Sequence, residues 1–277
     1  MAVKKSELYS TLWKCCDELR GGMDASQYKD YVLVILFVKY ISDKSRSDEG
    51  FDIDIPDGCH FEDFVALKGN PNIGEEMNKK MAALAEANQL DGVFVADFED
   101  DAKLGKGKDK VETLSKLIAV FQNENLDFSK NRTADDDLIG DAYEYLMKNF
   151  ATESGKSKGQ FYTPAEVSRV MAKVIGLGNA RNGKKTTIYD PTCGSGSLLL
   201  RAICETPDGA TIYGQEKDNA TVGLAKMNMI LHNEIYADIK QGDTINDPQF
   251  KDEIQKRFHR HAPQFLPSTS RRRVTNI

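Results

Sequence analysis

Residues 187–200 read TIYDPTCGSGSLLL, and this stretch decides the fold. β-Branched and aromatic residues open it as a short strand, two glycines form a turn, and the apolar run after Ser197 is typical of a helix. The order repeats downstream, with a strand expected at 211–216, a helix at 219–233 and a third strand at 234–240. Strands that alternate with helices at this spacing predict a parallel, doubly wound α/β sheet.

The first 150 residues follow a different pattern. Apolar residues recur at helical spacing near 6–20, 24–41, 75–89, 110–123 and 135–150, whereas 52–74 and 98–110 read as loops. This predicts a helical N-terminal domain. Residues 151–159 (ATESGKSKG) hold no bulky apolar side chain and are expected to form a linker or an active-site loop. A further helix should start at Thr163-Pro164 and direct four residues toward a core: Val167, Val170, Met171 and Val174.

The composition, 40% hydrophobic and 29% charged over 277 residues, is that of a folded globular chain. Its longest apolar run, 31–41, is interrupted by Lys39 and is too short to span a bilayer, so no membrane partner is expected. The five cysteines form no C-x-x-C pair, and the four histidines share no ligand spacing. These features predict a cytoplasmic protein without a disulfide framework or a metal site.

The net charge of −6 is unevenly distributed. No acidic residue follows Glu253, whereas six basic residues do, so residues 1–253 hold 31 basic against 43 acidic side chains. Non-specific DNA affinity comes largely from Lys and Arg at phosphates, and so acidic a body is a poor general phosphate binder. If the chain acts on DNA, a partner is expected to supply most of the contact.

Three acidic residues stand where the predicted strands end: Asp190, Glu216 and Asp243. Ligands of open parallel sheets bind beyond the carboxyl ends of the strands, so these side chains should share one site. Glu216 follows Gly196 by 20 residues, the separation at which a carboxylate accepts ribose hydroxyls. Asp243 is placed to accept a hydrogen bond from an amino group on a base. Together they predict a nucleoside pocket.

The glycine turn indicates which nucleoside. A nicotinamide dinucleotide needs G-x-G-x-x-G to seat its pyrophosphate, and Leu199 occupies the third glycine position here. Asp190 would repel a pyrophosphate but attract an ammonium group. S-Adenosyl-L-methionine carries an ammonium group and no phosphate, which favours it as the cofactor. The alternative, that Gly194–Gly196 is only a strand–helix turn, stays open at this point.

Several longer motifs occur in a fixed order. Residues 138–146 read LIGDAYEYL, 159–164 read GQFYTP, 190–197 read DPTCGSGS, 213–216 read YGQE and 242–244 read GDT. This combination resembles the amino-group DNA methyltransferases, and more specifically the modification (methyltransferase) subunit of type I restriction–modification systems. The resemblance runs from the N-terminal helices to about Phe250.

The resemblance implies a Rossmann-like methyltransferase sheet that binds S-adenosyl-L-methionine. In such a site the segment 160–165 and the turn 190–197 would hold the methionine part, Glu216 the ribose, and Asp243 would lie near the adenine. The implied cofactor-binding residues are Gln160, Phe161, Tyr162, Thr163, Pro164, Ala165, Asp190, Gly194, Ser195, Gly196, Ser197, Glu216 and Asp243. The family transfers a methyl group to the exocyclic nitrogen of adenine in DNA. The implied partners are DNA, a specificity subunit that chooses the target and the restriction subunit, with the helical part contacting partner subunits.

The sequence departs from the family at one decisive place. The family's catalytic Asn-Pro-Pro-Phe/Tyr motif, which binds a flipped adenine, does not occur here, and the sequence after Phe250 lacks the periodicity expected of a fourth strand. Residues 254–277 form instead a basic tail, either a genuine phosphate-binding arm or the product of a lost reading frame. We therefore expect three parts: a helical domain at 1–150, an incomplete methyltransferase domain at 151–253, and an aberrant tail at 254–277.

Three expectations follow from that departure. The chain has no assigned catalytic residue and should transfer no methyl group by itself. The first strand should keep an open edge that favours self-association. Three rival functions remain: a non-catalytic module that docks onto a specificity subunit, a stand-alone adenine methyltransferase and, more distantly, a nicotinamide-dependent dehydrogenase.

Overall fold

The computed structural model describes residues 9–13, 25–90, 92–129, 138–153, 165–179 and 186–250. Residues 9–13 are helical. In chain order the further elements are α2 (Ala25–Ser47), α3 (Phe61–Val65), α4 (Ile73–Asn88), α5 (Asp101–Leu104), α6 (Lys108–Phe121), η1 (Glu124–Leu126), α7 (Leu138–Glu153), α8 (Ala165–Val174), η3 (Leu177–Asn179), β1 (Thr187–Asp190), α9 (Ser197–Cys204), β2 (Thr211–Glu216), α10 (Asn219–Leu231) and β3 (Asp238–Gln241). The predicted order of a helical region followed by alternating strands and helices is confirmed.

The described sheet has three parallel strands in the order β1-β2-β3. Ile188 pairs with Ile212, and Gly214 pairs with Ile239, so the carboxyl ends of all three strands lie at one edge. β3 is shorter than predicted, because Asn233 adopts a positive φ of 64° and the chain turns before entering the strand. The parallel α/β architecture is confirmed, and it gathers the three strand ends at one place.

The two faces of the sheet are covered differently. Side chains alternate along a strand, so Ile188, Ile212 and Ile239 lie on one face, where they pack in a core with α9 and α10. On the other face Tyr189 and Tyr213 hold the ring of Phe250, at centroid distances of 5.6 and 5.2 Å. The chain after β3 therefore folds back and covers the second face.

α2 is the central helix of the N-terminal region and is longer than predicted. Every residue from 31 to 44 is buried, including two charged side chains that pair within the helix. Lys39 donates to both carboxylate oxygens of Asp43, at 2.7 and 2.6 Å. Because this pair satisfies its own charges, the helix continues past the apolar run and remains buried to Lys44.

Two segments predicted as loops contain short helices, and those predictions were wrong in part. α3 lies within 52–74, where Phe61 and Phe64 are buried. α5 lies within 98–110, where Asp100 caps the helix by accepting hydrogen bonds from two backbone N–H groups. The charged composition concealed single buried aromatic or aliphatic residues, and these anchor the segments to the helical core.

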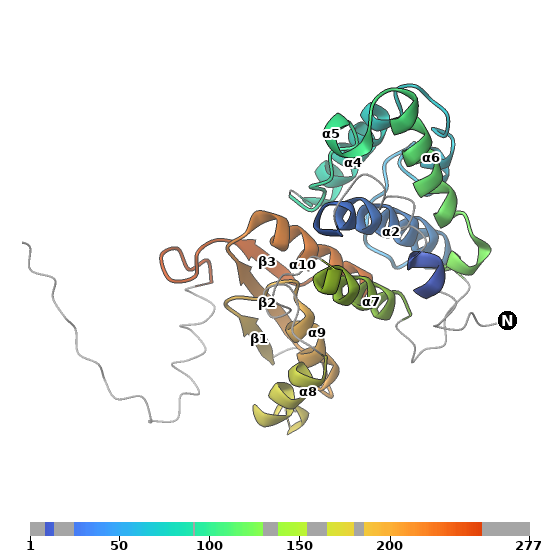
Figure 1. Ribbon diagram of the computed structural model, residues 1–277. Helices are drawn as coiled ribbons and strands as arrows, with labels where there is room; N and C mark the ends of the chain where they lie inside the picture. Colours follow the sequence, from blue (N-terminus) through green and yellow to red (C-terminus); the bar gives the residue numbers. More distant parts are fainter. Residues whose placement is uncertain are drawn as a thin grey trace, which may run out of the picture.

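α10 belongs to both halves of the molecule. In Figure 1 it lies between the sheet and the helices α2 and α7. Its Leu224, Met227 and Ile230 join the core of the helical region, whereas Val222 and Ala225 join the core of the sheet. Tyr143 of α7 donates a buried hydrogen bond of 3.0 Å to the carbonyl of Leu224. The helical region and the sheet therefore share one helix.

α8 corrects a further prediction. It packs against α9, but its apolar stripe does not enter a core. The exposed fractions of its Val170 and Val174 side chains are 61% and 79%, and three neighbours are also exposed: Val167, Met171 and Ile175. Figure 1 shows α8 at the end of the molecule beyond β1. Among the described strands, β1 pairs only with β2, so its other edge is not paired with a described strand.

None of the described helices is long and apolar enough to cross a membrane.

Candidate functional site

The three acidic residues predicted as a site all lie where the strands end. Asp190 is the last residue of β1, Glu216 is the last residue of β2, and Asp243 follows β3 by two positions. All three are partly buried. The hydroxyl of Thr244 donates to the carbonyl of Pro191, which joins the loop after β3 to the turn after β1. The prediction that these loops form one site is therefore consistent with the fold.

Glu216 organises the centre of this edge. Its Oε2 accepts a hydrogen bond of 3.1 Å from the backbone N–H of Gly194. Its Oε1 accepts from the N–H groups of Lys217 and Asp218, at 2.7 and 3.0 Å. A carboxylate offers about four acceptor positions, so these three donors fix its orientation and leave room for one more.

The turn between β1 and α9 is held by its own backbone. Cys193 N–H donates to the carbonyl of Gln215 at 3.0 Å, and Gly196 N–H donates to the carbonyl of Cys193 at 2.8 Å. Gly194 and Gly196 have φ values of +55° and +79°, which favour glycine. A Cβ at Gly194 would have no atom within 4 Å, so the space beside this residue is open. The turn is therefore held by backbone hydrogen bonds and presents an open surface at Gly194.

Asp243 is the most fully bonded of the three carboxylates. Its Oδ2 accepts from the ammonium of Lys217 at 3.0 Å and from the side-chain amide of Asn246 at 3.1 Å. Its Oδ1 accepts from the N–H groups of Ile245 and Asn246. The Lys217 hydrogen bond, followed by those from Asn246, lowers the pKa of Asp243 to about 2. A base that binds at Asp243 must replace one of these partners, and Lys217, 75% exposed, is the least confined.

Burial sets the protonation of the other groups at the turn. Desolvation, with a smaller contribution from the nearby Glu216 carboxylate, raises the pKa of Asp190 above its ordinary value, although the N–H of Thr192 donates to it. Desolvation by burial likewise raises the pKa of Cys193 to about 12, with Asp190 and Glu216 adding to the effect. The Cys193 thiol is therefore protonated and packs against the sheet, as its membership of the sheet core indicates.

The chemistry of this edge suits some ligands and excludes others. Two carboxylates, Asp190 and Glu216, face the turn, and the N–H of Gly194 is already bonded to one of them. A phosphate needs free N–H donors at such a turn and would be repelled by both carboxylates. Hydroxyl and ammonium groups are donors, and both match the acceptors present. The site therefore fits a nucleoside with a cationic substituent better than a dinucleotide.

Two buried amides support the site and were not singled out from the sequence. The side chain of Gln215 is fully buried, donates to the carbonyl of Asp247 and accepts from the N–H of Gln249. The side chain of Asn228 in α10 donates to the carbonyl of Ser195 at 2.8 Å. Polar residues inside otherwise apolar elements are the signal that could have revealed them.

Part of the predicted site lies outside the described residues: Gln160, Phe161, Tyr162, Thr163 and Pro164. Ala165 begins α8. Ser195 and Ser197 are buried in the turn, with their hydroxyl oxygens 3.1 Å apart. The tail predicted at 254–277 also falls outside the described part of the chain. Among the described residues, no group of three or more His, Cys, Asp or Glu could hold a metal ion.

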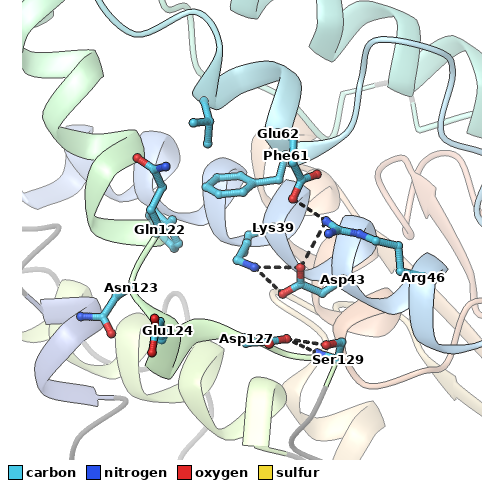
Figure 2. A pocket seen from close by; sticks show the side chains of 12 residues that line it. Lys39, Asp43, Arg46, Phe61, Glu62, Gln122, Asn123, Glu124, Asp127 and Ser129 are labelled. Atoms are coloured by element: carbon cyan, nitrogen blue, oxygen red, sulfur yellow. Dashed lines mark hydrogen bonds and ion pairs between the residues drawn. The ribbon is translucent and has the colours of Figure 1, made fainter.

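A separate pocket of about 450 Å³ lies in the helical region, away from the strand ends. Figure 2 shows its charged side chains pairing with one another: Lys39 with Asp43, and Arg46 with both Asp43 and Glu62. Asp43 also accepts the N–H of Phe128 at 3.0 Å. This network fastens the segment after α6 to α2, and we interpret it as structural.

Comparison with known families assigns both halves of the chain. Residues 8–121 match the HsdM N-terminal domain, and residues 134–262 match the N-6 DNA methylase family. The MpnII type I restriction enzyme methylase subunit of Mycoplasma pneumoniae is 30% identical over 87% of this chain and 53% of its own length. The MjaVII methylase subunit of Methanocaldococcus jannaschii is 31% identical over 88% of this chain and 44% of its own length.

A solved structure agrees with these matches. The type I restriction–modification methyltransferase subunit of Streptococcus thermophilus has a TM-score of 0.68 and 26% identity, over 89% of this chain and 60% of that one. This chain spans about half the length of the curated relatives described above. On the two successive domain matches, the relatives and the shared fold, the chain belongs to the family of type I restriction–modification methyltransferase subunits.

Proposed function

We propose that the edge formed by the ends of β1, β2 and β3 binds S-adenosyl-L-methionine. Asp190 would receive the ammonium group, Glu216 a ribose hydroxyl and Asp243 the adenine amino group. The turn residues Gly194 to Ser197 would line the methionine part, together with the segment 160–165. The observation that carries this proposal is the pair of carboxylates at a glycine turn whose N–H is already bonded to Glu216.

The reaction we propose is that of the family. A methyl group passes from the sulfonium of the cofactor to the exocyclic nitrogen of adenine in DNA, which loses a proton. The partners we propose are DNA, a specificity subunit that selects the target and the restriction subunit of the same system. The acidic body supports a division of labour in which another subunit makes most phosphate contacts. The chain has five cysteines, an odd number, and no C-x-x-C pair, which supports a cytoplasmic location.

We also propose that this chain alone binds cofactor but does not methylate DNA. An Asn-Pro-Pro-Phe/Tyr motif does not occur in its sequence, so it lacks the residues that hold the target amino group in the family. The division into a helical domain at 1–150, a cofactor-binding domain at 151–253 and a basic tail at 254–277 is part of the same proposal. Transfer of tritiated methyl to unmethylated plasmid DNA by the purified chain would contradict it.

Titration calorimetry with S-adenosyl-L-methionine tests the cofactor assignment. Glu216→Gln keeps the shape of the side chain but removes its charge, and should weaken binding about ten- to a hundredfold, the range for hydrogen bonds to a charged group. Asp208→Asn is the matched control, because Asp208 is exposed in the turn before β2, at the opposite end of that strand. An affinity for S-adenosyl-L-methionine that is unchanged in Glu216→Gln, or preferential binding of NADH, would refute the assignment.

The second candidate, a non-catalytic module that docks onto a specificity subunit, is favoured by the exposed apolar stripe of α8. Co-purification with a specificity subunit, without any cofactor binding, would support this candidate over the first.

A further inference from the structure

Asn228 is a polar side chain in an apolar position. It lies in α10 and has no exposed surface, and its neighbours along the helix, Met227 and Met229, are buried hydrophobic residues. Its Oδ1 has no hydrogen-bond partner among the described residues. A buried amide with an unsatisfied oxygen is less favourable than an apolar side chain of the same size. Its presence therefore points to a role for the remaining group, the Nδ2 donor.

That donor contacts the glycine turn. Asn228 Nδ2 donates to the carbonyl of Ser195 at 2.8 Å, across 33 positions of sequence. Ser195 stands between Gly194 and Gly196, both of which have positive φ. Glycine visits many conformations, so the two glycines alone do not determine the orientation of the Ser195 carbonyl between them. The hydrogen bond from Asn228 therefore fixes the plane of the peptide that joins Ser195 to Gly196.

The same helix, α10, also packs directly against the turn. A Cβ at Gly196 would come within 2.4 Å of Met229 Cε, so Gly196 lies directly against α10. On the Glu216 side, Gly194 is held by the carboxylate that ends β2. The turn is thus clamped between two supports, Glu216 on the ligand side and Asn228 behind it.

α10 is itself fixed from the helical region. Tyr143 donates to the carbonyl of Leu224, which is also the helical acceptor for the backbone N–H of Asn228, four residues later. Tyr143 is completely buried, and Leu224 belongs to the core of the helical region. The support behind the turn therefore rests on α7 and α2, and not only on the sheet.

We propose that Asn228 is a positioning residue of the cofactor site: it holds the Ser195 carbonyl, and through it the Gly194–Gly196 backbone, in the conformation that receives the ligand. This inference rests on the proposed function for its effect on cofactor affinity. Its effect on the turn itself is independent of any ligand. Asn228 makes no hydrogen bond to Glu216 or Asp190, whose donors are the N–H groups of Gly194 and Thr192 among others, so it acts through the turn.

Two readouts on the full chain test the inference. Asn228→Leu keeps the volume and removes the donor, and should accelerate hydrogen exchange of the 193–197 amides about three- to tenfold, the range that one buried hydrogen bond provides. The same variant should weaken binding of S-adenosyl-L-methionine by a similar factor. If the Asn228→Leu variant does not fold, Asn228→Ala serves as the second variant, because it removes the donor without adding a branched apolar side chain.

The matched control is Met227→Ala, the adjacent residue of α10, which is buried on the side of the helical core. It should lower the melting temperature without changing either exchange at 193–197 or cofactor affinity relative to wild type. Faster exchange at the turn in the Asn228 variants alone supports the inference. Unchanged exchange at 193–197 in folded Asn228 variants overturns it, as does an equal change in Met227→Ala. Faster exchange with no cofactor binding by wild type would refute the proposed function and leave the positioning of the turn supported.

Discussion

Gly194 and Glu216 lie 22 residues apart, and the backbone N–H of the first donates a hydrogen bond of 3.1 Å to the carboxylate of the second. This contact ties the turn after β1 to the end of β2, and it makes an acidic side chain part of the turn. A glycine turn of this kind ordinarily presents its N–H groups to phosphate. Here the donor is occupied and a carboxylate stands in its place, so the edge selects donor groups and not anions.

The two glycines of the turn should respond differently to alanine. At Gly196 a Cβ would meet Met229 Cε at 2.4 Å and φ is +79°, so Gly196→Ala should cost about 2–3 kcal/mol of unfolding free energy. At Gly194 the Cβ would meet nothing within 4 Å, and Gly194→Ala should cost only about 1 kcal/mol for its positive φ. Urea unfolding measures both. Because the added methyl of Gly194→Ala points into the open space of the site, cofactor affinity should fall more in this variant.

Cofactor affinity should depend on the protonation of Asp190. Burial raises the pKa of this carboxyl, so on acidification it takes up its proton at a higher pH than an ordinary aspartate does. An ammonium group binds the ionised form, and affinity should therefore weaken as the pH falls through this raised pKa. Calorimetry at several pH values checks the profile. Asp190→Asn should bind more weakly at neutral pH and show a flatter profile; an unchanged profile would contradict this role.

Cys193 should be unreactive although it lies in the turn. Its thiol is buried, and its pKa is raised to about 12, so very little thiolate exists at pH 8. Cys204, at the end of α9, is exposed and should be alkylated by iodoacetamide many times faster. Mass spectrometry of peptides after timed alkylation separates the two. Rapid modification of Cys193 in the folded chain would show that the turn opens.

The ion pair of Lys39 and Asp43 should matter for stability in an asymmetric way. Asp43→Ala leaves the buried Lys39 ammonium without its carboxylate, and should cost about 3–5 kcal/mol by urea unfolding. The double variant Lys39→Met with Asp43→Leu removes both charges and should recover much of that loss. If the double variant is as unstable as the single one, the other contacts of Asp43, with Arg46 and with the N–H of Phe128, are the important ones.

The exposed stripe of α8 should cause self-association through this end of the molecule. Val170 and Val174 are 61% and 79% exposed, and sedimentation should show larger species as concentration rises. Val170→Lys with Val174→Lys should shift the chain toward monomer. Glu166→Lys, on the same helix, controls for the added charge. A chain that stays monomeric at high concentration without these changes would contradict the prediction.

The sheet and the strand-end positions of the three acidic residues were predictable because their signals are local. Strand, turn and helix follow one another within 187–200, and the position of Glu216 relative to Gly196 follows from one β-α-β unit. The sequence alone therefore places the three acidic residues at the edge where the strands end. What the local pattern could not give is the hydrogen bond between Gly194 and Glu216, because it depends on how two loops approach.

Other features depended on contacts between distant segments. Asn228 was not singled out because a lone amide in an apolar helix acquires its meaning from Ser195, 33 residues earlier. The core prediction for α8 failed because an apolar stripe shows that a face can be buried, not that a partner for it lies in the described chain. α5 was missed because Asp100, one of a run of acidic residues, is a helix cap.

The most direct test of the account is a crystal structure of the chain with S-adenosylhomocysteine. We expect a ribose hydroxyl within hydrogen-bond distance of the Glu216 carboxylate, and the amino-acid part of the ligand against the 190–197 turn. We also expect the Lys217 ammonium group to have moved away from Asp243, where the adenine amino group then binds. A ligand bound elsewhere, or one whose ribose makes no contact with Glu216, would contradict the assignment of the strand-end site.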